Sequence, residues 1–321
     1  MQPIPAPQRR SRNLVFTSAG DRSNVRRWLR GRRRDFDLWI NYYGERPAAL
    51  QSLADIYSVN KGTKFQNLHY CHSRWPELFA SYEAVMVMDD DIIIGADALT
   101  RLFELQRELD LWALQPAFRI CGKLSWNITR VQPTARLRYT NFIEMTCPLF
   151  RRDKLDAFMA AYDPTGMGYG DDWWFLGTLG PDLVGHVAVV DEVSCINPHD
   201  RSKGGRREID RLSSPEERKA MWQRNKARHG LAEVRDHKEF GRIEKPVFDA
   251  LLGRARFLTE TTYVGGRRVL RRVLGSVRQS FPRERSKSRS AVAGDESGAA
   301  NETDATSARR LNRAETGTAG P

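Results

Sequence analysis

Residues 84–94 read AVMVMDDDIII, and this stretch decides the fold of the chain. The apolar run AVMVM predicts a short strand that is buried on both faces, as is typical of parallel sheets. Asp89, Asp90 and Asp91 follow the run directly. Because ligands of open α/β sheets bind beyond the carboxyl ends of the strands, the triplet marks a candidate site.

The chain on either side of this stretch alternates strand-like and helix-like segments. Apolar runs bounded by turn residues predict strands, and apolar residues at helical spacing predict helices. The alternation predicts an α/β fold, in which a mostly parallel central sheet is flanked by helices on both faces. The expected strands lie at 14–16, 36–43, 82–88, 112–114, 142–150 and 187–190, and the expected helices at 24–34, 50–57, 98–109, 155–162 and 214–229.

The 321 residues carry a formal net charge of +12, and the positive charge is concentrated near the two ends. Residues 1–34 hold ten arginines against one aspartate, and residues 254–289 hold eleven basic residues against two glutamates. Basic ends favour contact with an anionic surface, either a membrane or a nucleic acid. The body between them is mildly acidic, which argues against a nucleic-acid groove across the core.

We expect four parts along the chain: a flexible N-terminus at 1–12, a catalytic domain at 13–245, a basic amphipathic helical extension at 246–282 and a disordered tail at 283–321. The tail has almost no large apolar side chain that could offset its ordering entropy. Within the extension, residues 267–281 read RRVLRRVLGSVRQSF, with Val and Leu on one helical face and Arg on the other. That pattern is typical of helices that lie on anionic membranes, and also of a helix that caps the body with its arginines in solvent.

The sequence also indicates a compartment. No run approaches the roughly 18 consecutive apolar residues that cross a bilayer. The N-terminus MQPIPAPQRRSRN lacks the apolar stretch of a secretory signal. The four cysteines are far apart, with no CxxC pair, which argues against a zinc cluster or a disulfide framework. We therefore expect a cytoplasmic protein. If its basic helix binds membrane, we expect the protein to lie peripherally at the inner face.

Three adjacent carboxylates repel one another unless a cation or hydrogen-bond donors compensate. Alternate residues of an extended segment point the same way, so Asp89 and Asp91 can face one ion while Asp90 points elsewhere. Hard oxygen ligands suit Mn²⁺ or Mg²⁺. The plainer reading of the same residues is a surface turn or a helix cap.

Two further segments carry candidate residues. Gly168 to Asp172 reads GYGDD, a glycine loop that feeds a helix and can aim a carboxylate into a cleft. We expect one of the two acids to cap the helix and the other to act in the site; the plainer reading of Asp171 is a helix cap alone. His199 follows a later strand, and a neutral imidazole is a good ligand for a manganese-like ion, although a lone histidine is more often structural.

The order of these motifs resembles that of glycosyltransferases with the GT-A fold, which is Rossmann-like. More narrowly, the chain resembles the domain-of-unknown-function family numbered 707 (DUF707), which is grouped with GT-A enzymes. The resemblance covers about residues 13–200. It rests on the stretches VMVMDDDIII, ALQPAF, NFIEMTCPLF, GMGYGDDWWFLGTLG and VAVVDEVSCINPHD.

The resemblance implies a metal-dependent, inverting transferase that moves a sugar from a nucleotide sugar to the hydroxyl of a glycan, a lipid-linked or a small-molecule acceptor. The implied metal ligands are Asp89 and Asp91 of the DxD motif, completed by His199. Asp172 aligns best with the general base of the family, and Asp171 leaves that assignment open. The implied nucleotide contacts are Thr17, Ser18, Ala19, Gly20, Asp21 and Asp90, and the implied substrate contacts are Glu144, Gly170, Trp126 and Trp173.

Two other classes of protein share parts of this pattern. Aspartyl phosphohydrolases also place an Asp-x-Asp at a strand end, but normally on the first strand, whereas Asp89 and Asp91 follow a later one. A non-enzymatic protein could bind a membrane or a nucleic acid through its arginine-rich ends. Core packing is the simpler role for each tryptophan.

Overall fold

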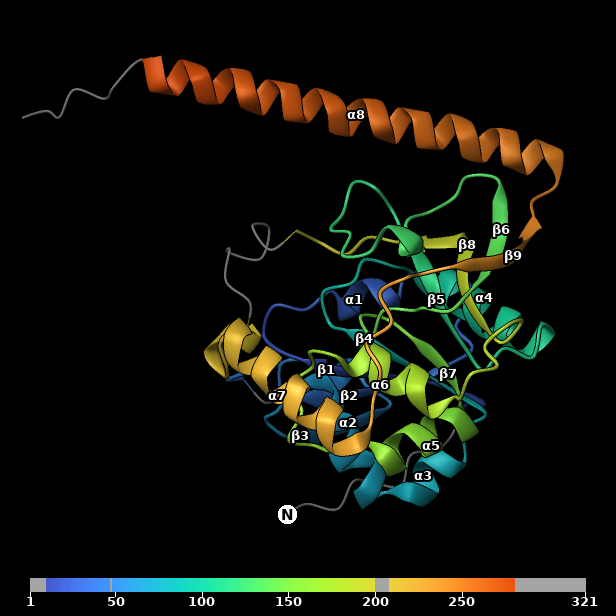
Figure 1. Cartoon of the computed structure of the whole chain (residues 1–321), viewed down its shortest axis with the longest axis vertical. Coiled ribbons are helices and arrows are strands. Elements are labelled where there is room, and N and C mark those ends of the chain that lie inside the picture. The colour runs from blue at the N-terminus through green and yellow to red at the C-terminus, as the bar shows by residue number, and fades with distance from the viewer. Residues whose placement is uncertain (1–9, 47, 200–207, 281–321) are drawn as a thin grey trace, which may run out of the picture. The chain divides into compact units, whose positions relative to one another are not determined.

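The computed structural model describes residues 10–46, 48–199 and 208–280 (Figure 1). The predicted tail at 283–321 and most of the predicted N-terminal segment lie outside these residues. The chain divides into two compact units, Met1–Arg272 and Val273–Pro321, so the larger unit ends inside the last helix. The domain boundaries expected from the sequence stay a prediction.

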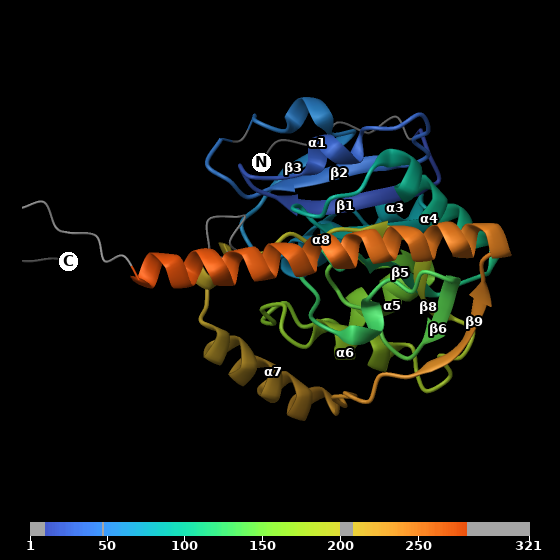
Figure 2. The same ribbon diagram turned by 90° about the horizontal axis from the view of Figure 1, so that it is seen from above.

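Within the described residues, nine strands form one sheet in the order β3-β2-β1-β4-β7-β5-β8-β6-β9. Figure 2 shows β1, β2 and β3 side by side at one end of this sheet. The strands are β1 (Asn13–Ala19), β2 (Asp37–Tyr42), β3 (Ile56–Val59), β4 (Ala84–Asp89), β5 (Ala113–Phe118), β6 (Ala135–Thr140), β7 (Leu149–Arg151), β8 (Val187–Cys195) and β9 (Glu239–Glu244).

The first half of the sheet is parallel. β1 pairs in parallel with β2 on one side and with β4 on the other, and β2 pairs in parallel with β3. The chain therefore builds outward from β1 in one direction and then returns to add β4 on the opposite side. This reversal of strand order is a topological switch point, and the crevice in which open α/β sheets bind ligands is therefore expected at the carboxyl ends of β1 and β4. Ser18 and Asp89 are register partners at these two strand ends.

Antiparallel strands enter in the second half. β7 is antiparallel to both β4 and β5, and β6 is antiparallel to both β8 and β9. β5 and β8 are parallel. The predicted α/β fold with a central sheet between helices is confirmed, with the purely parallel part confined to β3, β2, β1 and β4.

Helices cover both faces because alternate strand residues are apolar on both sides. Val15 packs in one core cluster with α4, whereas Leu14 and Phe16 pack in the other with α2, α5 and α6. In the described part of the chain, no helix combines the length and the hydropathy needed to span a bilayer. The helices are α1 (Val25–Trp28), α2 (Lys64–Arg74), α3 (Pro76–Ala80), α4 (Ala96–Glu108), α5 (Arg152–Ala161), α6 (Asp171–Thr178), α7 (Pro215–His229) and α8 (Val247–Ser280).

The predicted helix over 50–57 is wrong. A short 3₁₀ turn at Gln51–Leu53 leads instead into β3. Asp55 exchanges hydrogen bonds with Leu38: its carboxylate accepts from the Leu38 N–H at 2.8 Å, and its own N–H donates to the Leu38 carbonyl at 2.9 Å. The helical spacing of apolar residues was coincidental, because pairing with β2 extends the chain there.

Two other expectations differ in extent. The helix expected at 24–34 is only α1, because the indole of Trp28 donates to the Ile92 carbonyl at 2.8 Å and the chain then turns back toward Asp97. Of the extended segment at 142–150, only the last two residues belong to a strand, β7 (Leu149–Arg151). Helices α2 and α3 were not foreseen.

Candidate active site

The acidic triplet is tied to the loop that follows β1. The carboxylate of Asp90 accepts the Gly20 N–H at 2.9 Å, and its carbonyl accepts the Asn24 N–H at 2.6 Å. The Asn24 side chain donates to the Asp91 carbonyl at 2.5 Å. A side chain at Gly20 would place its Cβ only 2.8 Å from the Tyr43 ring, so the ring would have to shift to admit one. The loop after β1 and the triplet after β4 therefore form one connected edge of the crevice.

The predicted nucleotide loop is not uniform. Thr17 is fully buried and donates to the Met88 carbonyl at 2.9 Å. Asp21 faces the other way and accepts hydrogen bonds from Tyr42 and Arg46, the first of which chiefly lowers the pKa of Asp21. Ser18 is nearly buried and its hydroxyl accepts from the Asn67 amide at 3.0 Å. Ser18 is the register partner of Asp89, and the Gly20 N–H reaches the Asp90 carboxylate.

Lys64 is a site residue that the sequence analysis missed. It is the first residue of α2, and its Nζ lies 2.7 Å from Oδ1 of Asp89. The same ammonium donates to the carbonyls of Met145 and Thr146, the second at 3.1 Å. Its side chain is 12% exposed. The sequence feature that could have identified Lys64 is its position in the first turn of a helix. A lysine there opposes the helix dipole and needs a compensating partner elsewhere in the fold.

The segment before β7 brings a second carboxylate to the site. The Asp89 N–H donates to the Thr146 carbonyl at 2.9 Å, so this segment runs alongside the end of β4. Glu144 is 3% exposed and accepts hydrogen bonds from the hydroxyls of Thr129 at 3.0 Å and Thr146 at 3.3 Å. Burial, together with the nearby charge of Asp172, raises the pKa of Glu144 to about 7.

Asp172 reaches the site from the first turn of α6. Its Oδ1 accepts the Met145 N–H, and the residue is half-buried. Burial raises the pKa of Asp172 to about 6, and the Met145 N–H and the Lys64 charge oppose that rise. The carboxylates of Asp172 and Asp89 thus lie around the same ammonium and beside the same backbone segment.

Asp171 points into the protein. It is 1% exposed, and among the described residues its Oδ2 has no hydrogen-bond partner. Burial and the Asp172 charge raise the pKa of Asp171 to about 7. Gly170 precedes it with φ 91°, and a Cβ at Gly170 would lie 2.2 Å from the Trp222 ring. The glycine is therefore required by the left-handed backbone and by close packing on α7.

The two candidate tryptophans differ in exposure. Trp173 is 5% exposed, its indole N–H donates to the Val234 carbonyl at 2.9 Å, and it packs near Trp222. Trp126 is half-buried and meets the His237 ring edge to face, with 4.7 Å between the ring centroids. Of the two, only Trp126 keeps surface for a ligand.

His199 lies on the chain that leaves β8. Ile196 and Ile93 form a bridge with hydrogen bonds of 3.0 and 3.1 Å, so this segment runs beside the residues that follow Asp91. His199 is exposed three residues later. Across the described residues, no group of three or more His, Cys, Asp or Glu side chains is placed to hold a metal ion. The metal site that the sequence predicts at Asp89, Asp91 and His199 therefore stays a prediction.

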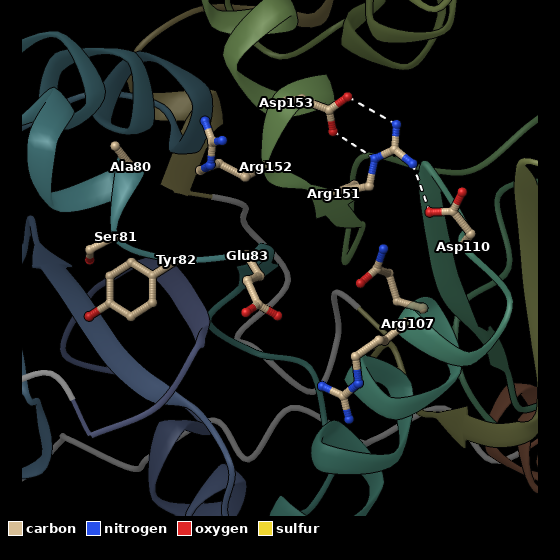
Figure 3. Close-up of a pocket in the computed structure, with 10 residues that line it drawn as sticks. Ala80, Ser81, Tyr82, Glu83, Arg107, Asp110, Arg151, Arg152 and Asp153 are labelled. Atoms are coloured by element: carbon tan, nitrogen blue, oxygen red, sulfur yellow. Dashed lines mark hydrogen bonds and ion pairs between the residues drawn. The ribbon is translucent and has the colours of Figure 1, made fainter.

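A pocket of about 530 Å³ lies at the opposite end of β4 (Figure 3). Arg151 pairs there with Asp110 at 2.8 Å and with Asp153 at 2.7 Å. Because ligands of parallel sheets bind at the carboxyl ends of the strands, this pocket at the amino end is not the candidate site. It is lined by Ala80, Ser81, Tyr82, Glu83, Gln106, Arg107, Asp110, Arg151, Arg152 and Asp153.

No protein-family model matches the chain, and no curated protein matches it in sequence. Among solved structures, the chain is similar to S. aureus TarS, with a TM-score of 0.44 and 12% identity over 62% of this chain and 63% of that one. S. aureus TarS in complex with UDP-GlcNAc gives a TM-score of 0.40 and 12% identity over 57% and 56%. A mycobacterial protein gives a TM-score of 0.43 and 13% identity over 73% and 83%. The likeness to DUF707 stays a resemblance of motifs.

Proposed function

We propose that this protein is a glycosyltransferase that moves a sugar from a nucleotide-sugar donor to the hydroxyl of an acceptor. The observation that carries the proposal is the convergence of Asp89, Lys64, Asp172 and Glu144 at the switch point between β1 and β4. Side chains from four separate segments meet at the edge where open α/β sheets bind ligands. The motif resemblance to GT-A enzymes supplies the class of donor.

The donor end of the site lies along the loop after β1 and the start of α2. The backbone of Gly20, held by Asp90, lines the crevice in which the nucleotide binds. Lys64 places a positive charge beside Asp89, where the diphosphate of the donor gains negative charge as the anomeric C–O bond breaks. A charge fixed in advance at that position favours the transition state over the ground state.

The acceptor end is built on Asp172. One carboxylate oxygen is held by the Met145 N–H, which orients the group and leaves it half-buried. A pKa of about 6 keeps Asp172 ionised at neutral pH but more basic than an exposed aspartate. Asp172 takes the proton of the acceptor hydroxyl as that oxygen attacks the anomeric carbon and the nucleoside diphosphate leaves. A single displacement of this kind inverts the anomeric configuration.

The neighbouring acids have supporting roles. Glu144 is held by two threonine hydroxyls and lies too deep to meet the acceptor directly, so it fixes the backbone of the segment that carries Met145. Asp171 is buried against the core and begins α6. We therefore assign the proton transfer to Asp172 rather than to Asp171.

The test is to incubate the purified protein with a panel of nucleotide sugars and to measure turnover as release of the nucleoside diphosphate. We expect turnover of at least one donor and its loss in Asp172→Asn. Release of inorganic phosphate from phosphate esters, with no nucleotide sugar consumed, would instead favour the phosphohydrolase reading.

Metal dependence and the cytoplasmic location stay predictions of the sequence. A Mn²⁺ or Mg²⁺ ion held by Asp89, Asp91 and His199 would neutralise the leaving diphosphate. That prediction expects EDTA to abolish turnover and added Mn²⁺ to restore it. Full activity in EDTA would contradict metal dependence and would indicate that Lys64 alone neutralises the leaving diphosphate.

A further inference from the structure

Helix α8 presents one face to the rest of its own compact unit. Gly253, Phe257, Glu260 and Val264 are half-buried, and their spacing of four, three and four residues places them on one stripe of the helix. Glu260 on this stripe is ion-paired with Arg119. A Cβ at Gly253 would lie 2.3 Å from the Pro133 carbonyl, so the helix backbone comes close to the body at this point.

The opposite face of α8 is apolar and exposed. At about 100° per residue, its members fall within one half of the helix circumference, away from the half-buried stripe. A contiguous apolar surface of this kind marks an interaction site rather than ordinary surface. We call it the outward face: Val247, Phe248, Leu251, Leu252 and Leu258, each between 55% and 79% exposed.

The sequence repeats an apolar pattern further along α8, which ends at Ser280 (Figure 1). In the sequence, Val269, Leu270, Val273, Leu274 and Val277 recur at the spacing of one helical face. Arg254 and Arg256 fall at the two edges of the outward face and are exposed. Long arginine side chains at such edges can lay their stems on apolar surface and keep their charge in the polar region.

We propose that the outward face of α8 binds the surface of an anionic lipid bilayer. Charge complementarity selects this occupant, because residues 247–280 hold seven arginines and only two acidic residues, Asp249 and Glu260. Of those two acids, Glu260 is already engaged by Arg119 on the inward stripe. A second copy of the same helix would bring arginine against arginine, whereas anionic headgroups neutralise them.

The geometry requires the helix to lie on the bilayer rather than to cross it. Seven arginines lie between Arg254 and Arg278, and no described helix is suited to spanning. The apolar half-cylinder then enters the boundary between headgroups and acyl chains, and the inward stripe remains on the protein. This inference does not depend on the proposed transferase activity.

The test is co-sedimentation of the full chain with vesicles of phosphatidylcholine alone and of phosphatidylcholine with 30% phosphatidylglycerol. We expect binding to the anionic vesicles and at least tenfold weaker binding to the neutral ones. The variant Leu251→Asp/Leu258→Asp should lose at least tenfold in affinity for the anionic vesicles. Its matched control is Val59→Asp/Val184→Asp, which adds the same charge at residues of similar exposure away from α8 and should bind like the native chain.

Thermal melting first establishes that both double variants are folded. Binding of the Leu251→Asp/Leu258→Asp variant equal to that of its control would overturn the proposal, as would a native chain that ignores anionic vesicles. Light scattering without lipid tests the other possible occupant, a second copy of the chain, by measuring the oligomeric state. A native dimer that the α8 variant converts to a monomer, with no lipid binding, would show that the outward face joins two copies of the chain.

Discussion

The two ends of β4 both carry charged clusters, but the clusters differ in burial and in balance. At the amino end, Arg151 pairs with Asp110 and Asp153, and these acids are 79% and 48% exposed as side chains. At the carboxyl end, Lys64 lies among carboxylates that include the buried Glu144. Exposed pairs are screened by water and contribute little, whereas buried acids in excess of their cations keep raised pKa values.

This difference separates a surface ion-pair cluster from a site that can do chemistry. Burial raises the pKa of Asp172 and Glu144, whereas the pKa of Asp153 at the amino end is lowered by its hydrogen bond with Arg151. Perturbed carboxylates in a crevice are candidates for acid–base work. The pocket at the amino end has a volume of about 530 Å³, yet its ion pairs are those of ordinary surface.

The largest expected effect tests the base. Asp172→Asn removes the proton acceptor and should lower turnover of the nucleotide sugar by about 10²–10⁴-fold. Its matched control is Asp153→Asn, which changes an exposed acid in the first turn of α5 and should leave turnover unchanged. Turnover is measured as kcat at saturating donor. An equal loss of kcat in both variants would contradict the assignment of the active site to the carboxyl end of β4.

The next effect concerns the cation. Lys64→Met removes the ammonium from Asp89 and from two carbonyls, and should cost about 1.5–3 kcal/mol in transition-state stabilisation, since hydrogen bonds to charged groups are of that size. The control is Lys61→Met, because Lys61 pairs with Glu45 where both side chains are exposed. Comparable kcat/KM values for the two variants would deny Lys64 its place in the site.

A smaller effect should appear as opposite pH trends of activity and stability. Asp172 must be ionised to act, so kcat/KM should fall as the pH drops below about 6. The raised pKa of Glu144, about 7, means that the folded state binds its proton more tightly than the unfolded chain does. The stability from this group is complete below about pH 4.5 and is lost as the pH rises through about 7.

Melting temperatures at pH 5 and pH 8 check this trend. These buried acids should make the native protein melt at a higher temperature at pH 5 than at pH 8. Glu144→Gln should reduce the difference between the two melting temperatures. A pH dependence of Glu144→Gln identical to that of the native protein would show that this carboxyl does not titrate as its burial indicates.

The smallest effect belongs to the amino end. Arg151→Met breaks exposed ion pairs and should change the free energy of unfolding by no more than about 1 kcal/mol, with turnover unchanged. Urea unfolding and the donor assay measure both quantities. A loss of activity in Arg151→Met would move the functional site toward the pocket of Figure 3.

The fold could be predicted furthest where local pattern and tertiary role agree. The run before Asp89 and the helix over 98–109 were found because burial on a sheet or on a helix face sets the period of the apolar residues. β3 was read as a helix because its four residues are too few to distinguish the two periods. Its partner strand decides its conformation, and that information lies outside the segment.

By itself, the sequence determined that a buried strand ends in three aspartates and that a glycine loop delivers two more acids to a helix start. It also determined that the C-terminal helix has an apolar side, because helical spacing is a local property of the chain. Only the tertiary structure decided that Lys64, 25 residues before Asp89, becomes its partner, and that Met145 holds Asp172. Such pairings depend on where separate segments meet around one crevice, and burial, not residue type, then sets how each acid holds its proton.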